Sequence, residues 1–149
     1  MMVSVGWVGC MPLELRDRYA DQVESYLPTP FAPLGAVYLD PEQAVGPPDA
    51  RSVALGAGAS VVLRFFRPAP NGPGPDLRLH ELGPDGARAR VAFSADGVEF
   101  VEVGDDAVGT VVFDLEAAGL EEATFVRVRG LDDAGPEPGY DLDAAEALH

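Results

Sequence analysis

The chain has no lysine, a single cysteine and a single tryptophan among its 149 residues. Its ten basic residues are all arginine and face 25 acidic ones, which gives a net charge of -15. Because such a charge is repelled by phosphate backbones and anionic lipids, we expect neither nucleic-acid binding nor membrane-surface binding. Cys10 alone excludes an intrachain disulfide. Membrane insertion is not expected either, since no apolar run is long enough to span a bilayer.

The composition is that of a globular domain with many turns. Hydrophobic residues make up 47% of it, and 17 glycines and 14 prolines are spread along its length. We expect one β-sandwich domain over residues 19–149, preceded by an N-terminal extension or degenerate leader over residues 1–18. The apolar start ends in Gly9-Cys10 and faintly resembles a lipoprotein signal, but it is short and lacks the basic region of a signal peptide.

Short runs rich in Val, Phe and Leu lie between the turn residues and alternate apolar with polar positions, as in Val61, Leu63 and Phe65. This pattern predicts strands buried on one face. The Asp96-Gly97 pair predicts a hairpin turn. The expected strands are 20–26, 60–66, 77–81, 89–94, 98–103, 110–113, 124–129 and 144–148, with one helical turn within 116–120. Eight short antiparallel strands favour an all-β fold, a two-sheet antiparallel jelly roll.

Carboxylates gather near the C-terminus. Asp141 and Asp143 stand two residues apart, so in a strand both point to one face, where they repel each other unless a cation lies between them. This spacing predicts a cation site, with solvated surface aspartates as the alternative. Asp76, at the end of a Gly-Pro loop, is a further source of oxygens. Glu146 points the opposite way by strand parity and joins only if a bulge breaks the alternation.

Seven segments in the same order resemble a family of bacterial exported and cell-surface domains with a galactose-binding-like (discoidin-type) jelly roll. The resemblance covers about Ala20 to Leu148. The segments are AVGPPD (44–49), VALGAGAS (53–60), GPGPDL (72–77), VAFSADG (91–97), FDL (113–115), FVRV (125–128) and GYDLDAAEAL (139–148).

The resemblance implies a structural Ca²⁺ where an early loop meets the last strand. Carried over to this chain, the metal ligands are expected among Asp49, Asp76, Asp141, Asp143 and Glu146. Ca²⁺ takes six to eight oxygens from carboxylates and backbone carbonyls, which Gly-Pro loops expose readily. The family usually has Pro-Asp-Gly where this chain has Pro48-Asp49-Ala50, so the resemblance implies a different local turn here.

The expected function is a non-catalytic, calcium-stabilised binding module of an exported bacterial protein, located at the cell surface, in the periplasm or outside the cell. The ligand expected from the resemblance is a glycan or another cell-surface group. Aromatic rings in exposed loops pack on sugar faces, which makes Tyr140 and Tyr38 candidates, although rings that cover the ends of the core remain an alternative. His80 is a further candidate on the outward face of a strand.

Two other functions stay open. One is a purely structural adhesion or assembly domain with no small ligand. The other is a hydrolase that uses paired aspartates such as Asp76 and Asp141, whose separation the sequence does not fix. The arginines at 88, 90, 127 and 129 form a possible basic stripe, and we expect them to pair with neighbouring acids instead.

Overall fold

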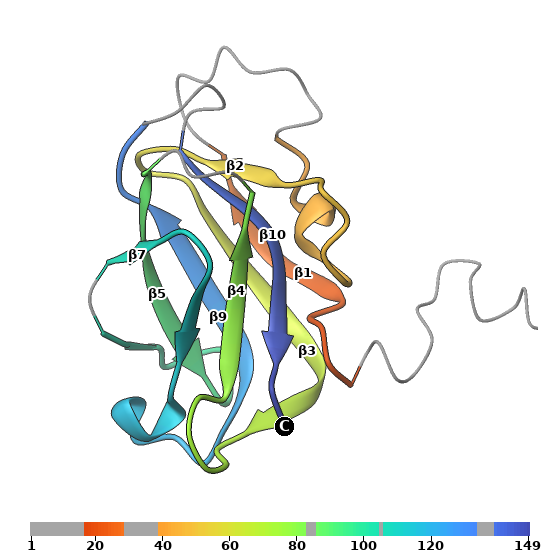
Figure 1. Cartoon of the computed structure of the whole chain (residues 1–149), viewed down its shortest axis with the longest axis vertical. Helices are drawn as coiled ribbons and strands as arrows, with labels where there is room; N and C mark the ends of the chain where they lie inside the picture. Colours follow the sequence, from red (N-terminus) through yellow and green to blue (C-terminus); the bar gives the residue numbers. More distant parts are fainter. Residues whose placement is uncertain (1–16, 29–38, 83–85, 105, 134–138) are drawn as a thin grey trace, which may run out of the picture.

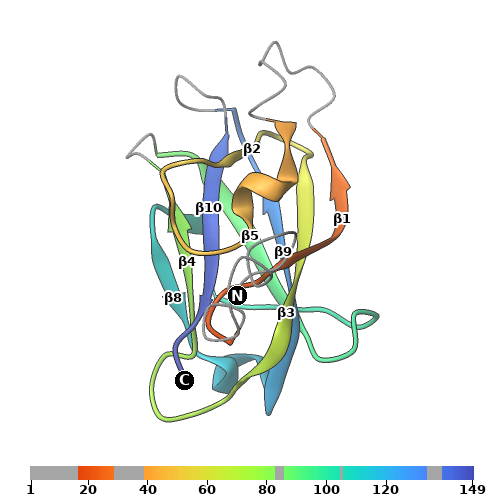
Figure 2. The same ribbon diagram turned by 90° about the vertical axis from the view of Figure 1, so that its right-hand side faces the viewer.

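The computed structural model describes residues 17–28, 39–82, 86–104, 106–133 and 139–149. These ranges contain ten strands and two 3-10 turns. The strands form two antiparallel sheets that pack face to face, as Figures 1 and 2 show from two sides. No helix in these ranges is long and apolar enough to cross a membrane. The expected all-β, two-sheet antiparallel sandwich is therefore confirmed.

The larger sheet has six strands in the order β1-β3-β9-β5-β6, with β7 also paired to β5. Their bounds are β1 Gln22–Leu27, β3 Ser60–Pro70, β5 Arg88–Ser94, β6 Val101–Glu102, β7 Ala107–Val108 and β9 Glu122–Gly130. The four-stranded sheet has the order β2-β10-β4-β8. Its strands are β2 Val53–Leu55, β4 Leu77–Glu81, β8 Val111–Phe113 and β10 Tyr140–Ala147, and the 3-10 turns are η3 Pro41–Ala44 and η4 Leu115–Ala118.

The core lies between the sheets and is made of the apolar positions that the alternation predicted. On β3, Val61, Leu63 and Phe65 are all fully buried, whereas the intervening Arg64 is exposed. The same alternation holds on β4. On β5 and β9 the core residues Val91, Phe93, Val126 and Val128 also alternate, although Ala92, Ser94 and Phe125 on the other face are buried as well. Burying each of these aliphatic or aromatic side chains contributes about 1.5–3 kcal/mol relative to leaving it exposed.

Several predicted boundaries were wrong. The strand expected over 98–103 is reduced to β6, because Asp96 Oδ1 accepts hydrogen bonds from the backbone N–H groups of Val98 and Glu99 at 2.9 and 3.0 Å. These bonds fold the residues after the turn into a loop, and Val98 is 81% exposed. The short strands β2 and β7 and the turn η3 had no counterpart among the expected elements.

The last strand, β10, starts at Tyr140 rather than at the expected residue 144, and all of its residues are buried. Its pairing with β4 shifts register between Leu142 and Ala144. Tyr140 and Leu142 face the core before this irregularity, and Ala145 and Ala147 face it afterwards. The extra residue therefore places Glu146 on the outer face of the sheet with Asp141. This is the bulge that Glu146 needs in order to share a face with an aspartate that precedes it by an odd number of residues.

The chain also crosses from one sheet to the other near its start. Ala147 N donates to Arg18 O, and Ala20 N donates to Ala145 O, so residues 18–20 run alongside the end of β10 before β1 joins the larger sheet. Residues 1–16 of the expected N-terminal extension lie outside the described residues.

Two glycines allow the end of β2 to pass close to the neighbouring backbone. A Cβ atom at Gly130 or at Gly139 would collide with the carbonyl oxygen of Leu55. Gly130 also exchanges backbone hydrogen bonds with the turn after β2, because its N–H donates to Ala59 O at 2.9 Å and its carbonyl accepts from Gly58 N at 3.3 Å. Backbone atoms cannot swing aside as a flexible side chain can, so both positions require glycine.

We predict that Gly130→Ala lowers the free energy of unfolding by more than about 2 kcal/mol, because the added methyl group must displace β2. Urea denaturation monitored by fluorescence measures the loss. Gly104→Ala is the control, since Gly104 has a φ of 69° but no atom within 4 Å of an added Cβ. Backbone strain alone makes that variant about 1 kcal/mol less stable. Equal losses in the two variants would contradict the close approach.

Candidate functional site

Asp49 and Asp143 meet where the early loop reaches the last strand. Asp143 is only 4% exposed, and its two carboxylate oxygens accept hydrogen bonds from the backbone N–H groups of Asp49 at 3.2 Å and Ala50 at 3.3 Å. Asp49 Oδ1 in turn accepts from Arg51 N at 3.0 Å. Ala50 has a φ of 64°, so an alanine occupies here the left-handed region that glycine favours.

The electrostatics of this pair favour a cation or a shared proton. Burial raises the pKa of Asp143, and the neighbouring Asp49 carboxylate raises it further, while the two backbone donors act in the opposite direction. Two carboxylates held together in this way repel each other when both are ionised. The structure thus brings Asp49 and Asp143 of the expected metal set together.

Asp76 lies elsewhere and has partners of its own. Its Oδ1 accepts from Gly72 N at 2.7 Å and lies 3.0 Å from His149 Nε2, and its Oδ2 accepts from Leu115 N at 2.7 Å. The Asp76 carbonyl also accepts from Leu148 N, just beyond the end of β10. This carboxylate, which is fully buried, therefore fastens the C-terminus and η4 to the start of β4.

Asp76 and Asp141, the aspartates named for the hydrolase alternative, lie far apart. Asp141 is the second residue of β10. Asp76 lies at the other end of this strand, where its carbonyl accepts a hydrogen bond from Leu148 N, seven residues after Asp141. At about 3.3 Å per residue of strand, the two aspartates are roughly 20 Å apart. Glycosidase carboxylates act at separations of about 5–9.5 Å, so Asp76 and Asp141 do not work as a pair.

Glu146 is held by two arginines and a histidine. Arg18 Nη2 donates to Glu146 Oε2 at 2.7 Å, while His80 Nε2 and Arg78 Nη1 lie 2.8 and 3.6 Å from Glu146 Oε1. Burial tends to raise the pKa of Glu146, but the hydrogen bonds from His80 and Arg18 outweigh it, and the pKa lies below its usual value. The Glu146 side chain is 6% exposed and joins the N-terminal segment, β4 and β10.

The five acids therefore do not fit a single calcium ion. Asp141 is 3% exposed, and its backbone N–H donates to Glu81 Oε2 at 3.2 Å. Within the described ranges, no group of three or more histidine, cysteine, aspartate or glutamate side chains is arranged to hold a metal ion. Any calcium ion at the expected place would need backbone carbonyls and water in addition to Asp49 and Asp143.

We predict that Glu146→Gln lowers the free energy of unfolding at pH 7 by about 2 kcal/mol, because the cations around it lose a buried charged partner. The sign of the pH dependence follows from the lowered pKa. The stability that Glu146 contributes is present above the unfolded-state pKa of about 4.3 and is lost as the pH falls through the lower folded-state value.

Denaturant titrations at pH 7 and at pH 3 measure the difference between the wild type and this variant. Glu102→Gln is the control, since Glu102 is a 44% exposed partner of Arg90 and Arg129 and its ion pairs are worth about 0–1 kcal/mol. A loss that is the same at both pH values would show that the glutamate acts by shape and not by charge.

The aromatic candidates need a correction. Tyr140 is not in an exposed loop but begins β10, with 0% exposure, and its hydroxyl donates to Gly109 O at 2.7 Å. Burial, with a smaller effect from Glu81, raises the pKa of that hydroxyl. The ring thus offers no free face to a sugar. Tyr38 lies outside the described residues, and His80 is tied to Glu146.

A shallow, open hollow of about 320 Å³ lies where the edges of the two sheets face each other. Its walls come from the segment before and within β7, from β8 and from η4. They are Val103, Gly104, Asp106, Ala107, Val111, Val112, Phe113, Asp114 and Ala117. The apolar periodicity of the sequence did not predict this hollow, because the two-residue strand β7 gives no periodic signal and only the flanking Gly104 and Gly109 mark its limits.

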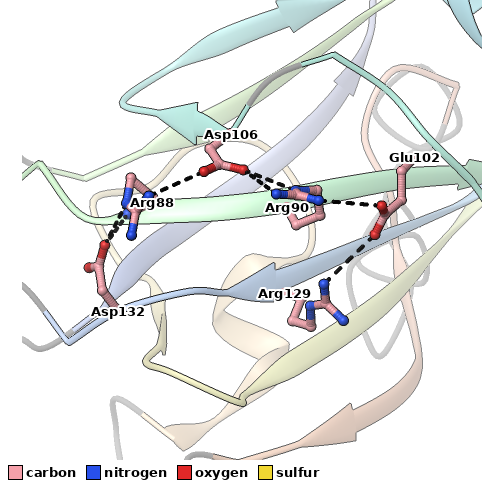
Figure 3. Close-up of polar contacts among 6 residues, drawn as sticks. All are labelled: Arg88, Arg90, Glu102, Asp106, Arg129 and Asp132. Carbon is pink, nitrogen blue, oxygen red and sulfur yellow. Dashed lines mark hydrogen bonds and ion pairs between the residues drawn. The ribbon is translucent and has the colours of Figure 1, made fainter.

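The expected pairing of the arginine stripe with acids is seen in Figure 3, on the outer face of the larger sheet. Ion pairs of 2.7–3.8 Å link six side chains into a chain of alternating charge. Its order is Asp132, Arg88, Asp106, Arg90, Glu102 and Arg129. The remaining member of the stripe, Arg127, lies 4.8 Å from the centre of the Phe100 ring. Asp106 therefore lines the hollow and at the same time anchors this network.

The chain matches no family model and no curated protein. Its fold is similar to that of chitosan-binding module 1 from a chitosanase/glucanase of Paenibacillus sp. IK-5, with 17% identity, a TM-score of 0.54, and 89% of this chain and 96% of that chain covered. It is also similar to the CBM32 of AlyQ, solved in complex with 4,5-unsaturated mannuronic acid, with 11% identity, a TM-score of 0.52, and 89% and 98% covered. At these identities the likeness shows the fold, and the galactose-binding-like jelly roll is confirmed.

Proposed function

We propose that this chain is a non-catalytic glycan-binding module of an exported protein and works at the cell surface or outside the cell. The observation that carries the proposal is the extent of the fold match, which covers 96% and 98% of two modules that are themselves named for chitosan binding or solved with a sugar acid. A fold alone can host many functions, so the site must be argued from this chain's own residues.

The hollow between the sheet edges supports the proposal and is where we place the glycan. Apolar walls with a few convergent polar groups are typical of small-ligand sites, and a volume of about 320 Å³ is at the lower end of their range. Val112 offers an apolar surface to the C–H face of a sugar ring. The carboxylates of Asp106 and Asp114 accept hydrogen bonds from hydroxyl groups.

We predict that Ala117→Arg weakens glycan binding at least about tenfold, because Ala117 is exposed on η4 and a long side chain there fills the hollow. A glycan array identifies the best ligand of the wild type, and isothermal titration calorimetry compares the two proteins. Ser25→Arg is the matched control. It places the same charged side chain at an exposed position of β1, at the opposite edge of the larger sheet.

Two outcomes distinguish an error in the proposed location of the site from an error in the proposed function. Equal affinities for the two arginine variants would move the site away from the hollow. An array on which the wild type binds no sugar would overturn the proposed function and favour the structural adhesion or assembly module.

We further propose that calcium, if it stabilises this module, is held by Asp49 and Asp143 together with backbone carbonyls of the early loop. The support is electrostatic, because these two carboxylates repel each other at the loop–strand junction and a divalent cation removes the repulsion. Asp76 and Glu146 have no part in it, since protein donors already surround both carboxylates.

We predict opposite effects of Asp49→Asn in the absence and presence of calcium. In EDTA the variant melts at a higher temperature than the wild type, since the amide removes the repulsion and can still accept the hydrogen bond from Arg51 N. In CaCl₂ at a hundred times Kd, the wild type gains about 2.7 kcal/mol and several degrees, and the variant gains much less.

Differential scanning calorimetry in EDTA, CaCl₂ and MgCl₂ measures these shifts. Glu24→Gln, at an exposed site on β1, removes the same amount of charge far from the pair and should respond to calcium as the wild type does. No calcium-dependent shift in the wild type would remove calcium from the proposal and leave the glycan site untouched.

A further inference from the structure

Five of the nine arginines in the described ranges lie on the outer face of the larger sheet. They are Arg64 on β3, Arg88 and Arg90 on β5, and Arg127 and Arg129 on β9. Each follows or precedes a core residue, such as Leu63, Val91 or Val128, so the five side chains point away from the core. This one face therefore gathers much of the positive charge of a chain whose net charge is -15.

Two of these arginines lie against aromatic rings instead of acids. Arg64 Cζ is 5.4 Å from the centre of the Phe125 ring, and Arg127 Cζ is 4.8 Å from the centre of the Phe100 ring. Within the described ranges, neither arginine forms an ion pair. A guanidinium group on a ring keeps its N–H donors in its own plane, where oxygen atoms can reach them at its edge.

The register of the sheet places no acid directly opposite Arg64, Arg127 or Arg129. Their neighbours across the strands are Gln22, Phe125, Val62, Ala92, Ser60 and Arg90. Also, no ion pair joins these three arginines to the acids of the adjoining edge strand and turn, which are Glu24, Asp96 and Glu99.

Arg90 and Arg129 lie directly opposite each other, and like charges in this position destabilise a sheet. Glu102 is shared between them, at 3.4 Å from Arg90 and 3.8 Å from Arg129, and Figure 3 shows it at the end of the ion-pair chain. Arg129 is still 49% exposed. An anion bound beside Arg129 would remove the repulsion that remains, so this costly pair is better explained by binding than by stability.

The arrangement suits oxyanions carried on a short sugar chain. Arg127 and Arg129 are two residues apart on β9, which separates their Cα atoms by roughly 7 Å, and Arg64 lies on the adjacent strand. Each guanidinium fork fits two oxygens of one oxyanion. Half-buried Val62, next to Arg127, offers apolar surface to a sugar ring.

Sulfate esters fit this face best, because they stay ionised over the whole pH range in which a protein is folded. A long polyanion such as nucleic acid meets the full charge of -15. A short sulfated sugar responds mainly to the nearest charges, since 0.1 M salt screens interactions beyond about 10 Å.

We propose that the outer face of the larger sheet is a second binding surface, which takes short sulfated glycans through Arg64, Arg127 and Arg129. It lies apart from the hollow beside β7 and β8 and does not depend on what binds there. The proposal can therefore fail while the proposed function stands, and the reverse also holds.

The test is isothermal titration calorimetry at pH 7 with three probes. They are a sulfated dextran oligosaccharide, the unsulfated dextran of the same length, and a single-stranded DNA oligonucleotide of the same charge. We expect the sulfated sugar to bind at least about tenfold more tightly than either of the others. Raising the salt from 50 to 500 mM should weaken its binding by about tenfold or more.

Arg129→Gln tests the location. We expect it to weaken binding of the sulfated sugar several-fold, because one guanidinium fork is lost. It should melt at about the same temperature as the wild type, because the loss of the ion pair with Glu102 is offset by relief of the repulsion from Arg90. Arg51→Gln is the matched control. It removes the same charge from an exposed position just before β2 and should leave the affinity unchanged.

Three results would overturn the proposal. Equal affinity for the sulfated and unsulfated sugars would show that sulfate is not recognised. Equal affinity for the sulfated sugar and the DNA, or equal losses in the Arg129 and Arg51 variants, would indicate general attraction of anions to arginine. Sedimentation velocity in the absence of sugar covers a different occupant, since self-association that Arg129→Gln abolishes would assign the face to a second copy of this chain.

Discussion

Four carboxylates are buried in or beside the four-stranded sheet, and the connections of this fold depend on how each is compensated. They are Asp76, Asp141, Asp143 and Glu146, with exposures of 0–4%. A buried charge is costly unless hydrogen bonds and opposite charges surround it. The donors come from segments far apart in sequence, as when the loop at Asp49 supplies backbone N–H groups to Asp143, or when Arg18 reaches Glu146. The carboxylates thus tie the N-terminal segment, the early loop and the C-terminus to β10 and β4.

The register irregularity in β10 makes this arrangement possible. A regular strand with Tyr140 and Leu142 facing the core would also place Glu146 in the core, where Arg18, Arg78 and His80 could not follow it. The extra residue between Leu142 and Ala144 turns the second half of the strand over. Small apolar residues, Ala145 and Ala147, then face the core, and the glutamate reaches Arg18 and His80 on the outer face.

Period-two alternation predicted the strands that have one face in the core and one outside, such as β3, β4, β5 and β9, and their core residues were identified correctly. It predicted only the second half of β10, as residues 144–148, because both faces of that strand are buried and polar residues such as Asp141 interrupt the apolar pattern at its start. Short edge strands such as β7 are set by pairing and not by propensity. The joint position of Asp49 and Asp143 could be expected from the family resemblance, whereas the partners of Asp76 and Glu146 depend on tertiary contacts that no local pattern encodes.

The short edges also explain why the sandwich has an opening at one side. The strands β7 and β8 have two and three residues, so the edges of the two sheets do not close over the core, and Val108 and Val112 remain 48% and 45% exposed. Exposed edges invite unwanted strand pairing, and charged side chains nearby oppose it. Asp106 is one such side chain, since its ion pairs with Arg88 and Arg90 hold the segment before β7 in place beside the hollow. The same ion pairs thereby oppose unwanted pairing at this edge and hold one wall of the opening in place.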